Sequence, residues 1–313
     1  MRVLLLLAIS YLYVLANAHI FVYHRFGDDK HASTNTTLQE LEKEFQYFND
    51  NGYKVVKIEE MIKKLNQKEK IPDNWVALTI DDSYKSFYTN GLPIFKKYNF
   101  PFTLAVYVKA TEKNYNDFMN WDEIKESAKY GTIALHSYGH AHLTHLSPEA
   151  IYKDTQIAFD KYEKELGYKP TIYVYPYGEY DEKVFNEIKK FNFDAILNQN
   201  SGSVNELSNV LDINRIALVG NVNIKQKLKY TTLEATWMEP KEYPKDNILK
   251  RVVAKVDPSI KSIKLYVTGD VWRDIKVKNG IIDEIVNIEL KKERVRVILS
   301  TDYYHLTSQI IIK

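Results

Sequence analysis

The chain contains no cysteine, and this absence removes several chemistries at once. Without thiols it can form no disulfide, no thiolate zinc site and no cysteine nucleophile. An excess of one charge is also lacking, since 43 Lys and Arg stand against 41 Asp and Glu, for a formal net charge of +2. That balance gives no electrostatic reason to expect nucleic acid as the main partner.

Long hydrophobic runs are absent after the first residues of the chain. Arg2 precedes an apolar run from Val3 to Leu15, and the small-x-small sequence Ala16-Asn17-Ala18 follows it. This pattern predicts a signal peptide over residues 1–18, because the run is too short for a comfortable membrane span. We therefore expect a secreted, periplasmic or cell-envelope protein with no membrane span after cleavage. The alternative is an uncleaved anchor.

The composition fits a globular protein with a substantial core, at 45% hydrophobic and 13% aromatic residues over 313 positions. Short apolar runs alternate with amphipathic stretches up to about residue 220, which predicts parallel βα units. There are seven or eight such units, enough to close a barrel. The expected strands span residues 20–23, 76–80, 102–108, 133–135 and 171–175, and the expected helices span residues 38–49, 85–98, 122–130, 148–166 and 181–191.

The pattern changes after residue 233, where helical periodicity gives way to alternating strands punctuated by turns. The expected strands here include residues 252–256, 263–267, 294–299 and 309–312. We therefore predict an α/β fold, with a distorted (β/α) barrel over residues 19–225 and a small all-β, sandwich-like domain over residues 230–313.

The residues that follow the predicted strands carry the chemistry, because in a βα barrel the carboxyl ends of the strands converge on one mouth. His136 and His140 are four apart and, with one Asp, would form a two-His, one-carboxylate site for a divalent Zn, Co, Ni or Fe ion. Asp81 and Asp82 are adjacent at a strand end, so one can bind metal while the other accepts a proton. Each pattern alone also fits surface histidines or an aspartate turn. The strand-end residues are His24, Asp81, Asp82, His136, Pro176, Tyr177 and Gly178.

Three segments in this order and spacing resemble the motifs of the polysaccharide deacetylases, carbohydrate esterase family 4, also called the NodB-homology domain. The resemblance covers residues 20–220, and the segments are Thr79-Ile80-Asp81-Asp82-Ser83-Tyr84, His136-Ser137-Tyr138-Gly139-His140 and Tyr175-Pro176-Tyr177-Gly178-Glu179-Tyr180. It implies a distorted barrel that hydrolyses N-acetyl groups on a glycan with one divalent metal ion. It also implies roles for matching residues: Asp82, His136 and His140 as metal ligands, Asp81 as general base, and the Tyr177 N–H as oxyanion donor beside Pro176.

The sequence departs from the family pattern at several points. The third motif lacks the arginine that usually orients the base, Ser83 replaces a glycine, and no Leu-x-His motif supplies the general acid. The opening Tyr23-His24-Arg25-Phe26 is similar to that of exported poly-N-acetylglucosamine deacetylases, which implies His24 as the acid. Arg215 could orient Asp81, and Asn198 could line the substrate pocket.

The leading hypothesis is therefore a metal-dependent deacetylase of an N-acetylglucosamine polymer, either an exopolysaccharide or a cell-wall glycan. Peptidoglycan, chitin-like oligomers and acetylated xylan stay open as substrates. A non-catalytic glycan-binding envelope protein is the alternative of a different class. A glycosidase fits poorly, since it needs two separated carboxylates. The expected partner is the glycan substrate, and whether the chain also has a protein partner stays open.

Overall fold

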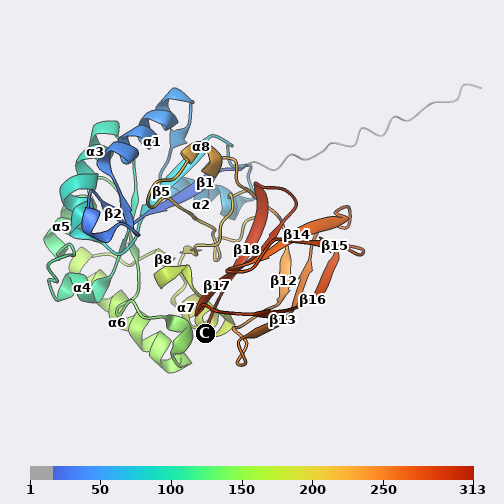
Figure 1. Ribbon diagram of the computed structural model, residues 1–313. Coiled ribbons are helices and arrows are strands. Elements are labelled where there is room, and N and C mark those ends of the chain that lie inside the picture. Colours follow the sequence, from blue (N-terminus) through green and yellow to red (C-terminus); the bar gives the residue numbers. More distant parts are fainter. Residues whose placement is uncertain (1–16) are drawn as a thin grey trace, which may run out of the picture.

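The computed structural model describes residues 17–313, which form a parallel α/β domain followed by an all-β domain (Figure 1). Most of the predicted signal peptide thus lies outside the described residues. Its last residue, Ala18, is fully buried and exchanges two backbone hydrogen bonds with Val204, at 3.0 and 2.7 Å. Among residues 17–313, no helix has the length and apolar character needed to cross a bilayer.

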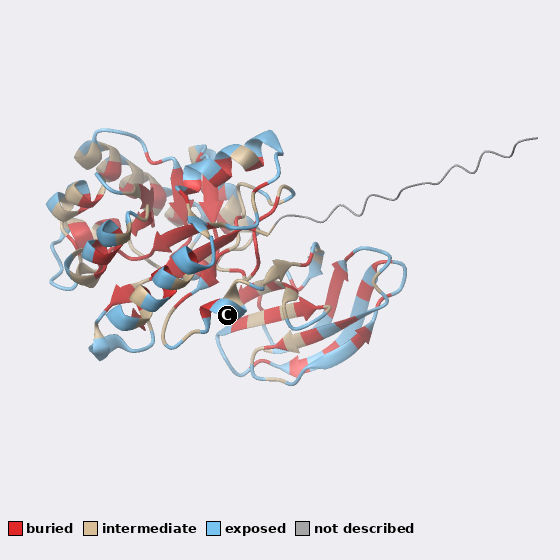
Figure 2. Ribbon diagram, turned by 90° about the horizontal axis from the view of Figure 1, so that it is seen from above, coloured by how far each residue is buried: buried red, intermediate tan, exposed pale blue. Residues whose placement is uncertain are grey.

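The first domain is built on a parallel sheet in the order β10-β1-β5-β6-β7-β8-β9, with β4 added beside β5. Its strands are buried along almost their whole length because helices cover them (Figure 2). The strands are β1 (His19–Tyr23), β4 (Lys54–Val55), β5 (Trp75–Ile80), β6 (Thr103–Val106), β7 (Thr132–Leu135), β8 (Ile172–Val174), β9 (Ala195–Leu197) and β10 (Ile216–Ala217). Two short strands, β2 (Arg25–Phe26) and β3 (Asn35–Thr36), pair separately.

The sheet does not close into a full barrel, which agrees with the predicted distorted barrel, although the expected number of βα units would be enough to close one. β9 and β10 are its two edges, and only an isolated bridge between Leu197 and Ile213 spans part of the gap. The chain between them is rich in Asn, whose side chains bind nearby backbone N–H groups: Asn198 accepts from Asn200, and Asn205 accepts from Leu207. Such local bonds favour turns over a strand ladder.

The helices lie around this sheet and begin with recognisable caps. In α1 the Thr37 hydroxyl and the Glu40 carboxylate form a capping box, and α6 begins at Pro148 with Ser147 as its cap. The α-helices are α1 (Leu38–Asp50), α2 (Ile58–Gln67), α3 (Leu92–Tyr98), α4 (Val108–Glu112), α5 (Trp121–Ser127), α6 (Pro148–Leu166), α7 (Glu182–Ile188) and α8 (Ile224–Lys227). Single helical turns are η1 (Asp29–His31), η2 (Phe87–Gly91), η3 (Leu143–His145), η4 (Pro176–Gly178) and η5 (Lys189–Phe191).

The second domain consists of two sheets that enclose an aliphatic core of their own, as expected for a small sandwich. The larger sheet has the order β11-β18-β17-β14-β15 and the smaller one β12-β13-β16. The strands are β11 (Thr231–Thr232), β12 (Thr236–Glu239), β13 (Ile248–Lys255), β14 (Ser262–Val267), β15 (Arg273–Lys276), β16 (Ile281–Glu289), β17 (Arg294–Ser300) and β18 (His305–Ile312). Buried and exposed residues alternate along these strands, so one face of each strand points into the core (Figure 2).

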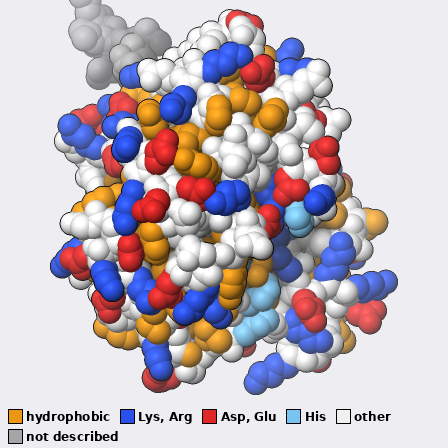
Figure 3. Space-filling view, turned by 90° about the vertical axis from the view of Figure 1, so that its left-hand side faces the viewer, with side chains coloured by type: hydrophobic (Ala, Val, Ile, Leu, Met, Phe, Trp, Pro, Cys, Tyr) orange, Lys and Arg blue, Asp and Glu red, His pale blue; other side chains and the backbone are white. Residues whose placement is uncertain are grey.

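Positive and negative side chains are interspersed over the face in Figure 3, as the balanced composition leads one to expect. No extended area of one sign is visible on that face.

Candidate metal and catalytic site

Three predicted metal ligands meet at the carboxyl ends of β5 and β7. Nε2 of His136 lies 3.2 Å from Oδ1 of Asp82, and Nε2 of His140 lies 2.8 Å from the same oxygen. The ligand atoms of all three residues lie within 4.8 Å of one another. Two ligands about 2.1 Å from a shared cation are roughly 3 to 3.5 Å apart, so the spacing suits a metal ion.

The state of these side chains also fits a cation. Nδ1 of His136 donates to the Val174 carbonyl at 2.8 Å, which leaves Nε2 to present its lone pair to the site. Oδ1 of Asp82 is buried and has no hydrogen-bond donor among the described residues. Burial disfavours the Asp82 carboxylate, yet the adjacent imidazoles hold its pKa well below the usual range. A divalent cation between these three side chains would accept the lone pairs that face one another.

Asp81 points to a different partner and forms a buried ion pair. Its two oxygens accept from Nη1 and Nη2 of Arg215 at 2.7 and 2.9 Å, and both side chains are almost without exposure. Arg215 is itself held, because its Nε donates to the Asn198 carbonyl and its Nη1 to the Thr79 hydroxyl. Burial alone would raise the pKa of Asp81, but the guanidinium charge lowers it. The arginine missing from the third motif is thus replaced in space by one from the start of β10.

His24 follows β1 and is half-buried beside the two aspartates. Its Nδ1 is buried and has no hydrogen-bond partner in the part of the chain that the structure describes. Burial lowers the pKa of His24, and the charges of Asp81 and Asp82 oppose this effect. The imidazole therefore belongs to the same electrostatic cluster, and its role as the acid stays a prediction.

The third motif forms the turn η4, where Pro176 is buried and Tyr177 is 38% exposed. Tyr177 has a left-handed backbone with φ of 58°. Its ring contacts the His140 ring, with centroids 4.6 Å apart, and stacks on the His142 ring at 4.2 Å. The Tyr177 side chain thus forms one wall beside the metal ligands, and the oxyanion role of its N–H stays a prediction.

Asn198 and His142 lie near this cluster with partners of their own. Asn198 is fully buried, its amide nitrogen donates to Asp212 at 2.5 Å, and its carbonyl accepts from Arg215; a role in lining the substrate pocket stays a prediction. His142 lies outside the metal cluster, and its Nδ1 is 2.7 Å from the Glu179 carboxylate.

Several residues that shape the site were not found from the sequence. The Asp154 carboxylate accepts from the backbone N–H groups of Tyr138 and Gly139 and so fixes the loop between the two histidines. From the β domain, Arg294 and Arg296 reach the loops after β8 and β9. These pairs are separated by 15 to 117 residues, and no local pattern indicates them.

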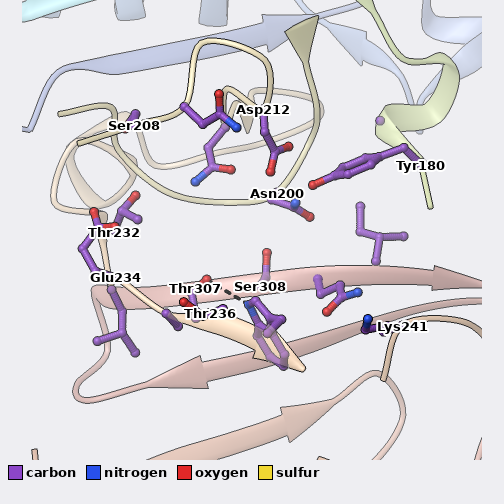
Figure 4. A pocket seen from close by; sticks show the side chains of 18 of the residues that line it. Tyr180, Asn200, Ser208, Asp212, Thr232, Glu234, Thr236, Lys241, Thr307 and Ser308 are labelled. Carbon is purple, nitrogen blue, oxygen red and sulfur yellow. Dashed lines mark hydrogen bonds between the residues drawn. The ribbon is translucent and has the colours of Figure 1, made fainter. Parts of the chain in front are cut away.

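A cavity of about 510 Å³ lies between the two domains and is lined in part by Gly178 and Tyr180 of the third motif. Figure 4 shows Tyr180, Asn200 and Asp212 of the first domain across the cavity from Thr307 and Ser308 of β18. The cavity shows that the two domains meet around the loops that follow β8 and β9.

Comparison with known proteins agrees with this geometry. A sequence profile of the polysaccharide deacetylase family matches residues 68–196, a range that includes all three motifs. Residues 68–196 carry the match to a polysaccharide deacetylase domain.

Relatives of the deacetylase domain extend the match to about two thirds of the chain. YxkH of Bacillus subtilis, whose name places it in the same family, is 23% identical over 202 residues, covering 64% of this chain and 71% of that protein. The poly-beta-1,6-N-acetyl-D-glucosamine N-deacetylase of Escherichia coli K12 is 25% identical over 244 residues, covering 64% of this chain but only 36% of that protein.

The fold is that of solved deacetylases. The Streptococcus pyogenes deacetylase PplD, solved in complex with acetate, superposes with a TM-score of 0.63 at 24% identity, covering 69% of this chain and 99% of that one. The predicted distorted barrel of the NodB-homology type is therefore confirmed, as an open parallel sheet with helices, and the all-β domain follows it.

Proposed function

We propose that this protein is a metal-dependent hydrolase that removes N-acetyl groups from an N-acetylglucosamine-containing polysaccharide, either an exopolysaccharide or a cell-wall glycan. The main support is the cluster of Asp82, His136 and His140 next to the Arg215-paired carboxylate of Asp81. The E. coli relative, named for deacetylation of poly-β-1,6-N-acetylglucosamine, supports the substrate class.

The residues divide the work of amide hydrolysis among them. Asp82, His136 and His140 would hold one divalent ion, which when bound activates water and polarises the acetyl carbonyl. Asp81, kept as a carboxylate by Arg215, accepts the proton of the attacking water. The Tyr177 N–H donates to the oxygen on which negative charge develops. His24 protonates the nitrogen as the C–N bond breaks, giving acetate and a glucosamine residue.

The test is acetate release from β-1,6-linked N-acetylglucosamine oligomers, with β-1,4-linked oligomers measured in parallel. Activity should disappear with a chelator and return with one of Zn²⁺, Co²⁺, Ni²⁺ or Fe²⁺. Asp81→Asn should lose about 100-fold or more in kcat and keep its bound metal. Asp82→Asn should lose both, and the exposed Asp283→Asn should change neither. Full activity of the Asp81→Asn protein would contradict the proposed role of Asp81 as the general base.

The non-catalytic glycan-binding alternative loses one of its grounds. That ground was the missing third-motif arginine, and Arg215 supplies a guanidinium to Asp81 from elsewhere. A binder has no use for a base paired in this way beside a metal cluster. For the cellular location we keep the proposal of an exported protein, which mass determination of the mature N-terminus would test.

A further inference from the structure

Strand β17 of the β domain presents two arginines to the deacetylase domain. Arg294 donates through Nε to the Glu179 carboxylate at 2.8 Å and through Nη2 to the Tyr177 carbonyl at 2.9 Å. Arg296 donates through Nη2 to the Gln199 carbonyl at 2.9 Å and through Nη1 to the Ser201 hydroxyl at 2.8 Å. Because the two arginines are two residues apart on a strand, their side chains leave the same face of the sheet.

The loops that they bind are the loops of the active site. Tyr177 carries the wall beside His140, and the side chain of Gln199 lies 3.4 Å from Oδ2 of Asp81. The two loops also pack directly on each other at Gly178, where an added Cβ would lie only 2.7 Å from the backbone nitrogen of Gln199. A displacement of either loop would therefore reach both Tyr177 and Asp81.

The carboxylate that Arg294 binds is buried, although the arginine side chain itself is 42% exposed. The Glu179 side chain has no exposure, and its carboxylate is bound by Arg294 and by Nδ1 of His142. Arg296 forms no ion pair with any carboxylate among residues 17–313, so its donors are directed to neutral oxygens of the loop after β9 and of Ser308. A guanidinium whose N–H groups donate to several oxygens of one loop fixes the position of that loop's backbone.

We propose that Arg294 and Arg296 are positioning residues of the deacetylase, through which the β domain completes the active site. Arg294 fixes the Tyr177 loop, and Arg296 fixes the Gln199 loop beside the base. The metal ligands lie in the loops after β5 and β7, and neither arginine donates a hydrogen bond to them, so we expect metal binding not to depend on the two arginines. This proposal rests on the proposed deacetylation.

The test compares Arg294→Ala and Arg296→Ala in the full chain with Arg251→Ala, which removes an exposed arginine of the same domain that pairs only with acidic side chains at the surface. Kinetics of acetate release, metal content and thermal unfolding are measured for each. We expect kcat to fall about 10- to 100-fold in the first two variants, with metal content unchanged and Arg251→Ala as wild type. Millimolar guanidinium should restore part of the kcat of Arg294→Ala, and Arg294→Lys should stay impaired because one ammonium cannot replace both donors.

A second measurement separates this proposal from the proposed function. Amide hydrogen exchange over residues 175–181 should accelerate in Arg294→Ala, and exchange over residues 198–202 should accelerate in Arg296→Ala, whatever the substrate. Exchange in β5 and β7 should stay as in wild type. If the wild type releases no acetate, the proposed deacetylase function is wrong. The hydrogen-exchange measurement still tests whether Arg294 and Arg296 fix the two loops. Loops that exchange as in wild type, or variants within about twofold of its kcat, would overturn the proposal; for a variant that does not fold, Glu179→Gln replaces Arg294→Ala.

Discussion

The ion pair between Arg215 and Asp81 offers a quantitative test of the site. Arg215→Met strands a carboxylate that is only 1% exposed. Removing one partner of a buried pair costs about 3–5 kcal/mol of unfolding free energy. Protonation of the stranded Asp81 limits the cost at pH 7, since moving a carboxyl from about pKa 3.9 to neutrality costs about 4 kcal/mol. We therefore expect Arg215→Met to lose about 3–4 kcal/mol of stability.

The assay is a double-mutant cycle with Asp81→Asn, measured by urea unfolding with and without saturating metal. The double variant leaves no stranded charge, so the coupling between the two sites should be about 2 kcal/mol or more. A matched control exists in Arg251 and Asp283, which pair through two bonds of 2.7 Å but are each nearly half exposed. The same cycle there should give less than about 1 kcal/mol. Equal coupling in the two cycles would refute the claim that burial makes the Arg215 pair strong.

Further predictions concern a buried acid and a tight glycine. Burial beside Tyr23 raises the pKa of Glu44 to about 8, so between pH 4.5 and 8 the folded state binds the proton that the unfolded state has lost, and stability should fall as pH rises through this window. Glu44→Gln should abolish that decline in urea unfolding measured from pH 4 to 9; parallel curves would contradict it. Gly178→Ala should reduce kcat about tenfold or more, because its Cβ would lie 2.3 Å from Cβ of Gln199. Gly52→Ala, with a similar φ of 71° but open space around it, should leave acetate release unchanged, and equal losses in both would point to backbone strain alone.

The sequence predicted the local part of the fold well. The helix expected over residues 148–166 is observed with those bounds, because a Ser cap, an N-terminal Pro and the glycine at 167 define its ends. The distorted barrel was also predicted, and its open side lies where the chain after β9 satisfies its backbone through asparagine turns and not through a further strand. Apolar periodicity reports which residues are buried, and it contains no information on whether two distant edges pair.

In the candidate site, too, the residues that are close in sequence were predicted and the distant partners were harder to find. The metal cluster was predictable because His136 and His140 are close in sequence and Asp82 follows β5, whose carboxyl end lies at the same edge of the sheet as that of β7. The guanidinium that binds Asp81 comes from a residue 134 positions later, and Arg294 binds Glu179 across 115 positions. Such pairs depend on tertiary placement, so composition and motif spacing could suggest Arg215 and gave no sign of Arg294.

The strained backbone of the motifs explains why these distant contacts matter. Asp82, Ser83, Ser137, His140 and Tyr177 all have positive φ, between 49° and 73°, although none is a glycine. A left-handed residue with a side chain costs roughly 1–2 kcal/mol, so these loops would not adopt the geometry alone. Ser83, which stands where the family usually has glycine, shows the compensation: its hydroxyl donates to the Asp82 carbonyl at 2.5 Å, and its own carbonyl accepts from the Met119 N–H. The same reasoning applies to Tyr177, whose carbonyl is bound by Arg294, and it makes the β domain part of what holds the catalytic geometry.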